Sequence, residues 1–287
     1  MRRLRLFSAF LAALVVTIGL LVGLATTSAH ATAPFNPAFI VSDDSFFNYQ
    51  AMSATEVQDF LEQQLCVSRD SAPCLADFRQ TTGDRTRSGP GQCDGYTGAA
   101  DERASRIIWK VAQSCRINPA VLLVLLQKEQ SLVTRPSLAG YQKATGYACP
   151  DSADCNAKYL GFVNQVYMAG WQLREYTQHP NAWRYRIGKT KVQYHPKLEC
   201  GSSVVNIRNQ ATADLYNYTP YQPNADTIAH PHGPATSCST YGNLNFSSIW
   251  RQWFGDPLAV RFPDWFPGCL NFVGGQDCPA PSVPAFG

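Results

Sequence analysis

The sequence predicts a mainly α-helical (α+β) fold with a small β element, stabilised by disulfides. Three observations support this prediction. Apolar residues recur at helical spacing in several segments, only short stretches alternate as strands do, and all ten cysteines lie beyond the first 31 residues. No internal repeat is present. We therefore expect a helical domain with few strands, of the disulfide-containing kind found in secreted proteins.

The first 31 residues predict a secretory signal peptide. Arg2, Arg3 and Arg5 form a basic start, an apolar run follows, and Ala29-His30-Ala31 matches a cleavage site. An uncleaved anchor is the alternative, because the apolar run approaches membrane-spanning length. The small residues at the end favour cleavage after Ala31. The mature chain is then expected to be secreted, without stable membrane insertion.

The charge balance gives no sign of a nucleic-acid partner. Loss of Arg2, Arg3 and Arg5 with the signal reduces the 24 basic residues to 21, equal to the 21 acidic ones. The formal net charge of the mature chain is therefore near zero. No basic cluster with interleaved aromatic residues stands out either, so we predict no nucleic-acid binding.

The cysteines predict disulfides rather than a metal site. Cysteines that are close in sequence suggest the disulfides Cys66–Cys74, Cys149–Cys155 and Cys269–Cys278. By elimination, the remaining four cysteines suggest Cys93–Cys115 and Cys200–Cys238. Sequence alone leaves this connectivity open. The ligand spacing of structural zinc sites is missing, and three of the histidines (His195, His230 and His232) adjoin prolines in loop-like sequence. We predict no metal and no cofactor.

The first half of the mature chain predicts three helices. Ser53-Ala-Thr-Glu56 is a capping box that opens a helix. Its apolar face would hold Val57, Phe60, Leu61 and Leu65. A second helix is predicted from Ala100 to Cys115, with one face made of Ala104, Ile107, Ile108, Val111, Ala112 and Cys115. The third begins at Asn118 and Pro119, a cap followed by proline at the first helical position.

The second half predicts one long helix, a β element and two short helices. The long helix should run from about Asn156 to Tyr176, with Phe162, Val163, Val166, Tyr167 and Leu173 inward. Residues 185–194 alternate and are the best candidate for a hairpin, and residues 204–207 for a further strand. Short helices are predicted at 210–218 and 247–254. The latter would have Ser247 as N-cap and Gly255 as its end.

Four segments follow from these patterns. Residues 1–31 are the signal peptide, and residues 32–98 form an N-terminal helical segment that ends in a Gly-, Thr-, Arg- and Ser-rich linker. Residues 99–256 form the main domain, and residues 257–287 are a proline-rich tail without periodicity.

Glu129 is the first candidate for chemistry. It ends the most apolar helical run of the chain, three, four and seven positions after Leu126, Leu125 and Leu122. Because those positions share one helix face, the carboxyl is expected to lie against packed leucines. Such surroundings disfavour the charged form and suit a proton donor. The alternative is a helix-end glutamate that reaches water.

The segment around Glu129 resembles the lysozyme-like superfamily, in particular its soluble lytic transglycosylases and glucosaminidases. The matching stretch is Asn118-Pro-Ala-Val-Leu-Leu-Val-Leu-Leu-Gln-Lys-Glu-Gln-Ser131, although Gln130 separates the glutamate from the serine. Ala139-Gly140 and Gly146-Tyr147 fall where the family has a Gly-rich loop. Ala213-Asp-Leu-Tyr216-Asn217 is similar to the family's Ala-x-x-Tyr-Asn motif. The flanking parts resemble secreted actinobacterial proteins labelled haemagglutinin-like.

The resemblance implies a lysozyme-like helical domain that cleaves β-1,4 glycan bonds of peptidoglycan by general acid/base catalysis. Glu129 would be the catalytic residue, with either a transglycosylase or a hydrolase outcome. Peptidoglycan or another cell-wall glycan would be the partner. The expected substrate-binding residues are Gln142, Tyr147, Tyr216, Asn217, Tyr218 and Tyr221.

Two questions stay open at this stage. A second carboxylate could come from Asp151, Asp154 or Glu175, although turn or surface roles are the simpler reading for each. The chain could also be a non-catalytic, haemagglutinin-like protein that binds cell walls or glycans, or a purely structural secreted protein. The acid at the motif position favours an enzyme, a glycosidase or lytic transglycosylase.

Overall fold

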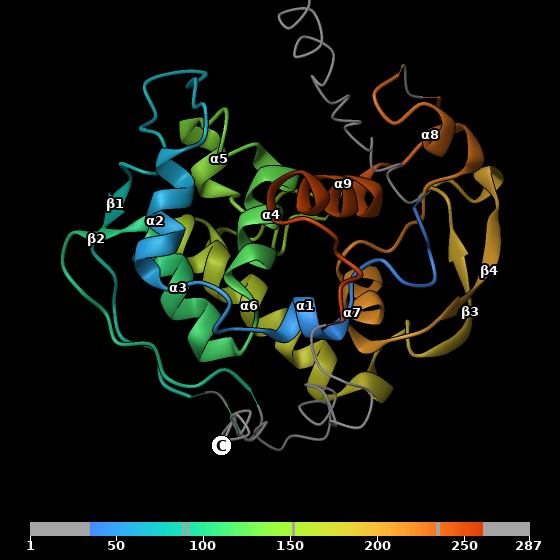
Figure 1. Cartoon of the computed structure of the whole chain (residues 1–287), viewed down its shortest axis with the longest axis horizontal. Helices are drawn as coiled ribbons and strands as arrows, with labels where there is room; N and C mark the ends of the chain where they lie inside the picture. Colours follow the sequence, from blue (N-terminus) through green and yellow to red (C-terminus); the bar gives the residue numbers. More distant parts are fainter. Residues whose placement is uncertain (1–34, 88, 90–91, 151–152, 234–235, 261–287) are drawn as a thin grey trace, which may run out of the picture. The chain divides into compact units, whose positions relative to one another are not determined.

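A computed structural model describes residues 35–87, 89, 92–150, 153–233 and 236–260. This part is mainly helical with two small antiparallel sheets, which confirms the predicted fold class (Figure 1). Its helices are α1 (Asp43–Phe47), α2 (Ala54–Glu62), α3 (Ala104–Cys115), α4 (Pro119–Gln130), α5 (Leu138–Gln142), α6 (Phe162–Gln178), α7 (Gln210–Tyr218), α8 (Ala225–Ala229) and α9 (Gly242–Phe254). Its strands are β1 (Arg79–Gln80), β2 (Glu102–Arg103), β3 (Gly188–Gln193) and β4 (Ser202–Ile207).

Helix α4 is the centre of the core. Residues 119–126 are all buried, and α3, α6 and α9 pack around the helix (Figure 1). A helix that is apolar on every side has to be covered on every side. The predicted start is confirmed, because the Asn118 side chain accepts a hydrogen bond from the Ala120 amide at 2.9 Å. Ser131, with a φ of 55°, ends the helix.

Helices α2 and α3 pack against each other and differ from the predictions at their ends. The capping box of α2 is confirmed: the Ser53 amide donates to Glu56 Oε2 at 2.7 Å, and the Glu56 amide donates to Ser53 Oγ at 3.2 Å. The helix ends at Glu62, however. Leu65 is 83% exposed and is wrong as a core residue. Leu65 lies next to Cys66, and the Cys66–Cys74 disulfide closes a loop after the end of α2.

Helix α3 begins at Ala104, four residues after the predicted start. The reason is that Glu102 and Arg103 pair with β1 in a short antiparallel ladder. The predicted inward face of α3 is confirmed, since all six of its apolar residues are buried.

Helix α6 begins at Phe162, six residues after the predicted start, because Gly161 takes a positive φ of 96°. A short 3₁₀ turn, Ala157–Tyr159, precedes it. The predicted inward residues are confirmed, since all five are buried.

The β element pairs differently from the prediction. Residues 185–194 supply the single strand β3, not a hairpin, and its partner is β4, the predicted strand extended back to Ser202. The register joins Gly188 to Ile207 and Gln193 to Ser202. The sheet lies beside α7 and α8 in Figure 1.

Helix α7 has the predicted bounds, and helix α9 does not. Helix α9 begins at Gly242, so Ser247 lies buried inside it and is wrong as an N-cap. The early start follows from Asn243, whose side-chain amide donates to the carbonyl oxygens of Thr219 and Tyr221 at 2.9 and 3.0 Å. The predicted end at Gly255 is confirmed.

Four disulfides hold the described residues together, and all four match the suggested pairings. They are Cys66–Cys74, Cys93–Cys115, Cys149–Cys155 and Cys200–Cys238. The suggested Cys269–Cys278 pair, the signal peptide and nearly all of the proline-rich tail lie outside the described residues. Within the described part, no helix combines the length and the apolarity that a membrane crossing requires.

Candidate functional site

The C-terminal end of α4 opens into a cavity of about 690 Å³. Helix α4 is buried up to Leu126, and its last turn then carries Lys128 and Glu129 to the cavity wall. Among the described residues that line the cavity, Glu129 is the only carboxylate. The lining consists of Lys128, Glu129, Gly146, Cys149, Pro150, Pro196, Tyr218, Thr219, Pro220, Tyr221, Gly242 and Asn245.

Glu129 is paired with its chain neighbour. Lys128 Nζ lies 2.6 Å from Glu129 Oε1, and their side chains are 6% and 26% exposed. The same ammonium donates to Thr219 Oγ1 at 2.8 Å. The carboxyl therefore reaches the solvent of the cavity, whereas the lysine beside it is nearly covered.

A tight loop places the backbone of Gly146 close to Oε2, the Glu129 carboxyl oxygen that Lys128 does not contact. Gly146 has a φ of 72°, and a Cβ built on it would lie 3.2 Å from Glu129 Oε2. The buried side chain of Gln165 on α6 fixes this loop. Its oxygen accepts from the Tyr147 amide at 3.1 Å, and its nitrogen donates to the carbonyls of Tyr147 and Tyr159 at 2.9 and 2.8 Å.

Tyr218 and Tyr221 are the two predicted tyrosines that line the cavity with Glu129. Tyr218 ends α7, and its hydroxyl donates to the Thr145 carbonyl at 2.8 Å. Burial, and then the charge of Glu129, hold the pKa of the Tyr218 phenol well above its ordinary value. This phenol is therefore neutral and fixed in place, with its proton directed to the loop backbone.

Tyr216 and Asn217 do not line the cavity. Tyr216 is fully buried, and its hydroxyl donates to the Pro37 carbonyl at 2.9 Å. The Asn217 side chain bonds the backbone of Tyr185 through both of its ends, at 3.0 and 2.9 Å. Both residues tie α7 to neighbouring segments of the core.

Tyr147 and Gln142 are not part of the cavity lining. The Tyr147 ring packs edge-on against Tyr159, with 5.1 Å between ring centroids, and burial raises the pKa of its phenol. Gln142 is exposed at the end of α5. Of the six predicted substrate-binding residues, the structure thus brings two into contact with the cavity of Glu129.

No second carboxylate joins Glu129 among the described lining residues. Glu175 instead accepts from the Gln92 side chain at 2.6 Å and lies 2.9 Å from His179 Nδ1. Asp154 is exposed, and Asp151 lies outside the described residues. In the described part of the chain, no group of three or more His, Cys, Asp or Glu residues is placed to hold a metal ion.

Sequence reasoning missed three residues that shape this site. Lys128 pairs with Glu129, Thr219 holds Lys128, and Gln165 holds the loop that carries Gly146. Lys128 directly precedes Glu129 in the sequence, so an ion pair between the two side chains could have been predicted. Gln165 gave none, since a glutamine on a helix is usually exposed.

The family relationship comes from a match that spans most of the chain. The family model described as "LasA, N-terminal domain" matches residues 39–265. This chain belongs to the LasA N-terminal domain family. No curated protein and no solved structure matches it.

Membership in the LasA N-terminal domain family corrects the resemblance to the lysozyme-like superfamily, which is wrong. The match runs continuously from residue 39 and includes α1 and α2, which that resemblance did not cover. The motifs behind the resemblance also have structural explanations. The apolar run before Glu129 is the buried central helix, and Tyr216 belongs to the core.

Proposed function

We propose that this chain is a secreted glycan-cleaving protein, in which Glu129 acts as general acid and base on β-1,4 bonds of peptidoglycan or another cell-wall glycan. One observation carries the proposal: Glu129 is the only carboxylate among the described lining residues of an open cavity, and two tyrosines share that cavity. A solvent-reachable acid beside aromatic side chains suits a sugar polymer, because aromatic faces pack on sugar rings while their hydroxyls bond to them.

In this mechanism one carboxyl group serves both half-reactions. Protonated Glu129 gives its proton to the oxygen of the leaving sugar as the glycosidic bond breaks. The resulting carboxylate then takes a proton from the nucleophile, which is water for hydrolysis or the sugar's own hydroxyl for a transglycosylase outcome. The backbone at Gly146 limits the space on one side of the carboxyl. Tyr218 lines the site as a neutral phenol and donates no proton to the substrate, because its hydroxyl donates to the Thr145 carbonyl.

Secretion is proposed on two grounds. The predicted signal peptide directs export, and four disulfides in the described residues suit an oxidising compartment. A cell-wall location follows from the glycan substrate. Peptidoglycan is the polymer to test first.

The second candidate is a protein that binds cell-wall glycan without cutting it. The Lys128–Glu129 ion pair favours it, because a carboxyl that already accepts from an ammonium can accept further hydrogen bonds from sugar hydroxyls without any transfer of a proton. Glycosidases also commonly use two carboxylates, and the described lining offers one.

Digestion of purified sacculi separates the candidates. The mature protein, Glu129→Gln and the control Glu62→Gln are incubated with sacculi, and turbidity and soluble muropeptides are followed. Glu62 is an exposed glutamate at the end of α2 and does not line the cavity. The proposal predicts release by wild type and control and none by Glu129→Gln. No release by any protein, together with retention on insoluble peptidoglycan, would support the binding candidate. Equal release by all three would rule out the role of Glu129.

A further inference from the structure

Positive charge is concentrated in one segment of the chain. Residues 180–210 contain six basic side chains, namely Arg184, Arg186, Lys189, Lys191, Lys197 and Arg208, against the single acid Glu199. After removal of the predicted signal peptide the whole chain is close to neutral, so the remainder of it is net acidic. A local excess of this kind attracts anionic partners.

The exposed face of the β3–β4 sheet carries part of this charge. Lys189 and Lys191 both lie exposed on β3, opposite Asn206 and Val204 of β4, which are exposed too. Neither strand contains an acidic residue. Arg208 continues this face beyond the end of β4, and its guanidinium lies over a phenylalanine ring.

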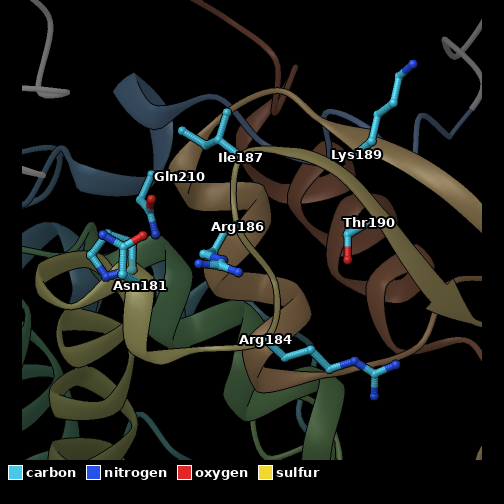
Figure 2. A pocket seen from close by; sticks show the side chains of 8 residues that line it. Asn181, Arg184, Arg186, Ile187, Lys189, Thr190 and Gln210 are labelled. Atoms are coloured by element: carbon cyan, nitrogen blue, oxygen red, sulfur yellow. The ribbon is translucent and has the colours of Figure 1, made fainter.

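A cavity of about 470 Å³ lies at the start of β3 and extends the basic face. It is lined by Pro180, Asn181, Arg184, Arg186, Ile187, Lys189, Thr190 and Gln210, so its described lining contains no carboxylate. Figure 2 shows the Arg186 side chain pointing toward Asn181 and Gln210, whereas Arg184 and Lys189 extend away from it in different directions.

These cations are available to a ligand. No ion pair joins Arg184, Arg186 or Lys189 to a carboxylate within the described residues, and all three are exposed. The Arg184 guanidinium lies 5.1 Å from the centre of the Tyr185 ring. Stacking of this kind leaves the N–H groups at the edge of a guanidinium free to donate.

We propose that this basic surface, made of Arg184, Arg186, Lys189, Lys191 and Arg208, binds a linear polyol phosphate, a polymer that carries phosphate groups at short, regular spacing and no bases. The cations diverge, so they do not converge on one small anion. They can instead contact successive charges of a chain. Alternate residues on one face of a strand are about 7 Å apart, which suits a polymer with one charge in each short repeat.

Two other polyanions fit the surface less well. Nucleic-acid bases need exposed aromatic rings to stack on, but Tyr185 is buried, and Trp183 packs edge-on against Tyr176 at 4.6 Å. The large exposed apolar side chains of residues 180–210 are the aliphatic Ile187, Leu198 and Val204. A polysaccharide with one uronic acid per disaccharide spaces its charges more widely than alternate strand residues do.

The test measures binding of a labelled synthetic poly(glycerol phosphate) by fluorescence anisotropy over a range of salt concentrations. The triple variant Arg186→Gln/Lys189→Gln/Lys191→Gln is compared with the triple variant Arg69→Gln/Arg135→Gln/Lys143→Gln. The latter removes three cations elsewhere that are exposed too. Both variants lose the same formal charge. Thermal melts check that both are folded.

The expected result is that the first variant binds about tenfold or more weakly, with a salt slope smaller by about 2 to 3, while the second stays within about twofold of wild type. Equal losses in both variants, or wild-type binding by the first, would overturn the proposal. So would equally tight binding of hyaluronate, which has one uronic acid per disaccharide, or of single-stranded DNA of matched charge. The inference does not depend on Glu129, so it can fail or succeed independently of the proposed glycan cleavage.

Discussion

The Glu129 carboxylate lies directly against the backbone of Gly146. A Cβ built on Gly146 would be 3.2 Å from Oε2 and 3.4 Å from Cδ of Glu129. Any side chain larger than hydrogen at residue 146 would therefore press on the carboxyl. Gly146 and Glu129 both line the cavity, and Glu129 is the only carboxylate among its described lining residues.

Substitution Gly146→Ala should shift the Glu129 carboxyl by a few tenths of an ångström and lower glycan release. Gly201→Ala is the matched control, because Gly201 has a similar φ of 78° and its nearest neighbouring atom would be 4.0 Å from the added Cβ. Both variants should lose about 1–2 kcal/mol of stability from the left-handed backbone. Only Gly146→Ala should lose activity in the sacculus assay. Equal activities in the two variants would contradict the role of this contact.

Gln165→Leu should disorder the loop that carries Gly146. The substitution leaves the Tyr147 amide and carbonyl and the Tyr159 carbonyl without their buried partner. Each such group costs about 1–3 kcal/mol, so the free energy of unfolding in urea should fall by several kcal/mol. Glycan release should fall even under conditions where the variant is folded. A fully active variant of wild-type stability would refute this account of the loop.

Lys128→Gln tests the ion pair. A glutamine can still donate to Thr219, but it removes the ammonium that lies 2.6 Å from Glu129 Oε1. Without the ammonium, Oε1 loses its partner and the carboxyl is held less firmly, so glycan release should fall while the variant stays folded. The measurement is muropeptide release at equal protein concentration, with a thermal melt to check folding. Wild-type release by the folded variant would separate Lys128 from the chemistry of Glu129.

Asp43 makes stability depend on pH. Burial raises the pKa of Asp43 to about 6, against hydrogen bonds from Ala211 and Asn209 that lower it. Because this pKa lies above the unfolded value of about 4, the contribution of Asp43 to stability is complete below pH 4 and is lost as the pH rises through 6. Asp43→Asn cannot ionise. Between pH 4 and pH 8 its unfolding free energy should therefore gain about 3 kcal/mol relative to wild type.

Urea unfolding at the two pH values measures this difference. Asp59→Asn is the control, because Asp59 is an exposed aspartate on α2. Its stability relative to wild type should be the same at both pH values. If Asp43→Asn behaved in the same way, the carboxyl of Asp43 would not be the titrating group.

Local signals in the sequence predicted the helices well where the ends of a helix depend on its own residues. Asn118 and Pro119 start α4 as expected, and Ser53 and Glu56 start α2. Long-range contacts decided the other ends. The pairing of Glu102 with β1 delayed α3, and the bonds of Asn243 to the Thr219–Tyr221 segment let α9 begin before Ser247.

The site was predictable only in part, for a related reason. The leucines and valines of α4 lie on every side of the helix. Sharing a face with leucines therefore did not indicate where the Glu129 side chain points. Its exposure arises because it lies beyond the buried part of the helix. Tyr216 and Tyr218 are two positions apart on α7 and face different surroundings. Tyr216 meets Pro37 in the N-terminal segment, a contact that no local pattern reveals.

The most direct test is to measure soluble muropeptides by mass spectrometry for equal amounts of wild type and Glu129→Gln bound to sacculi. Normalising to bound protein separates cleavage from binding. Muropeptides released by wild type, with none above background from an equally bound Glu129→Gln, would show that Glu129 does the chemistry. Equal release per bound molecule would contradict the central claim that this carboxyl cleaves the glycan.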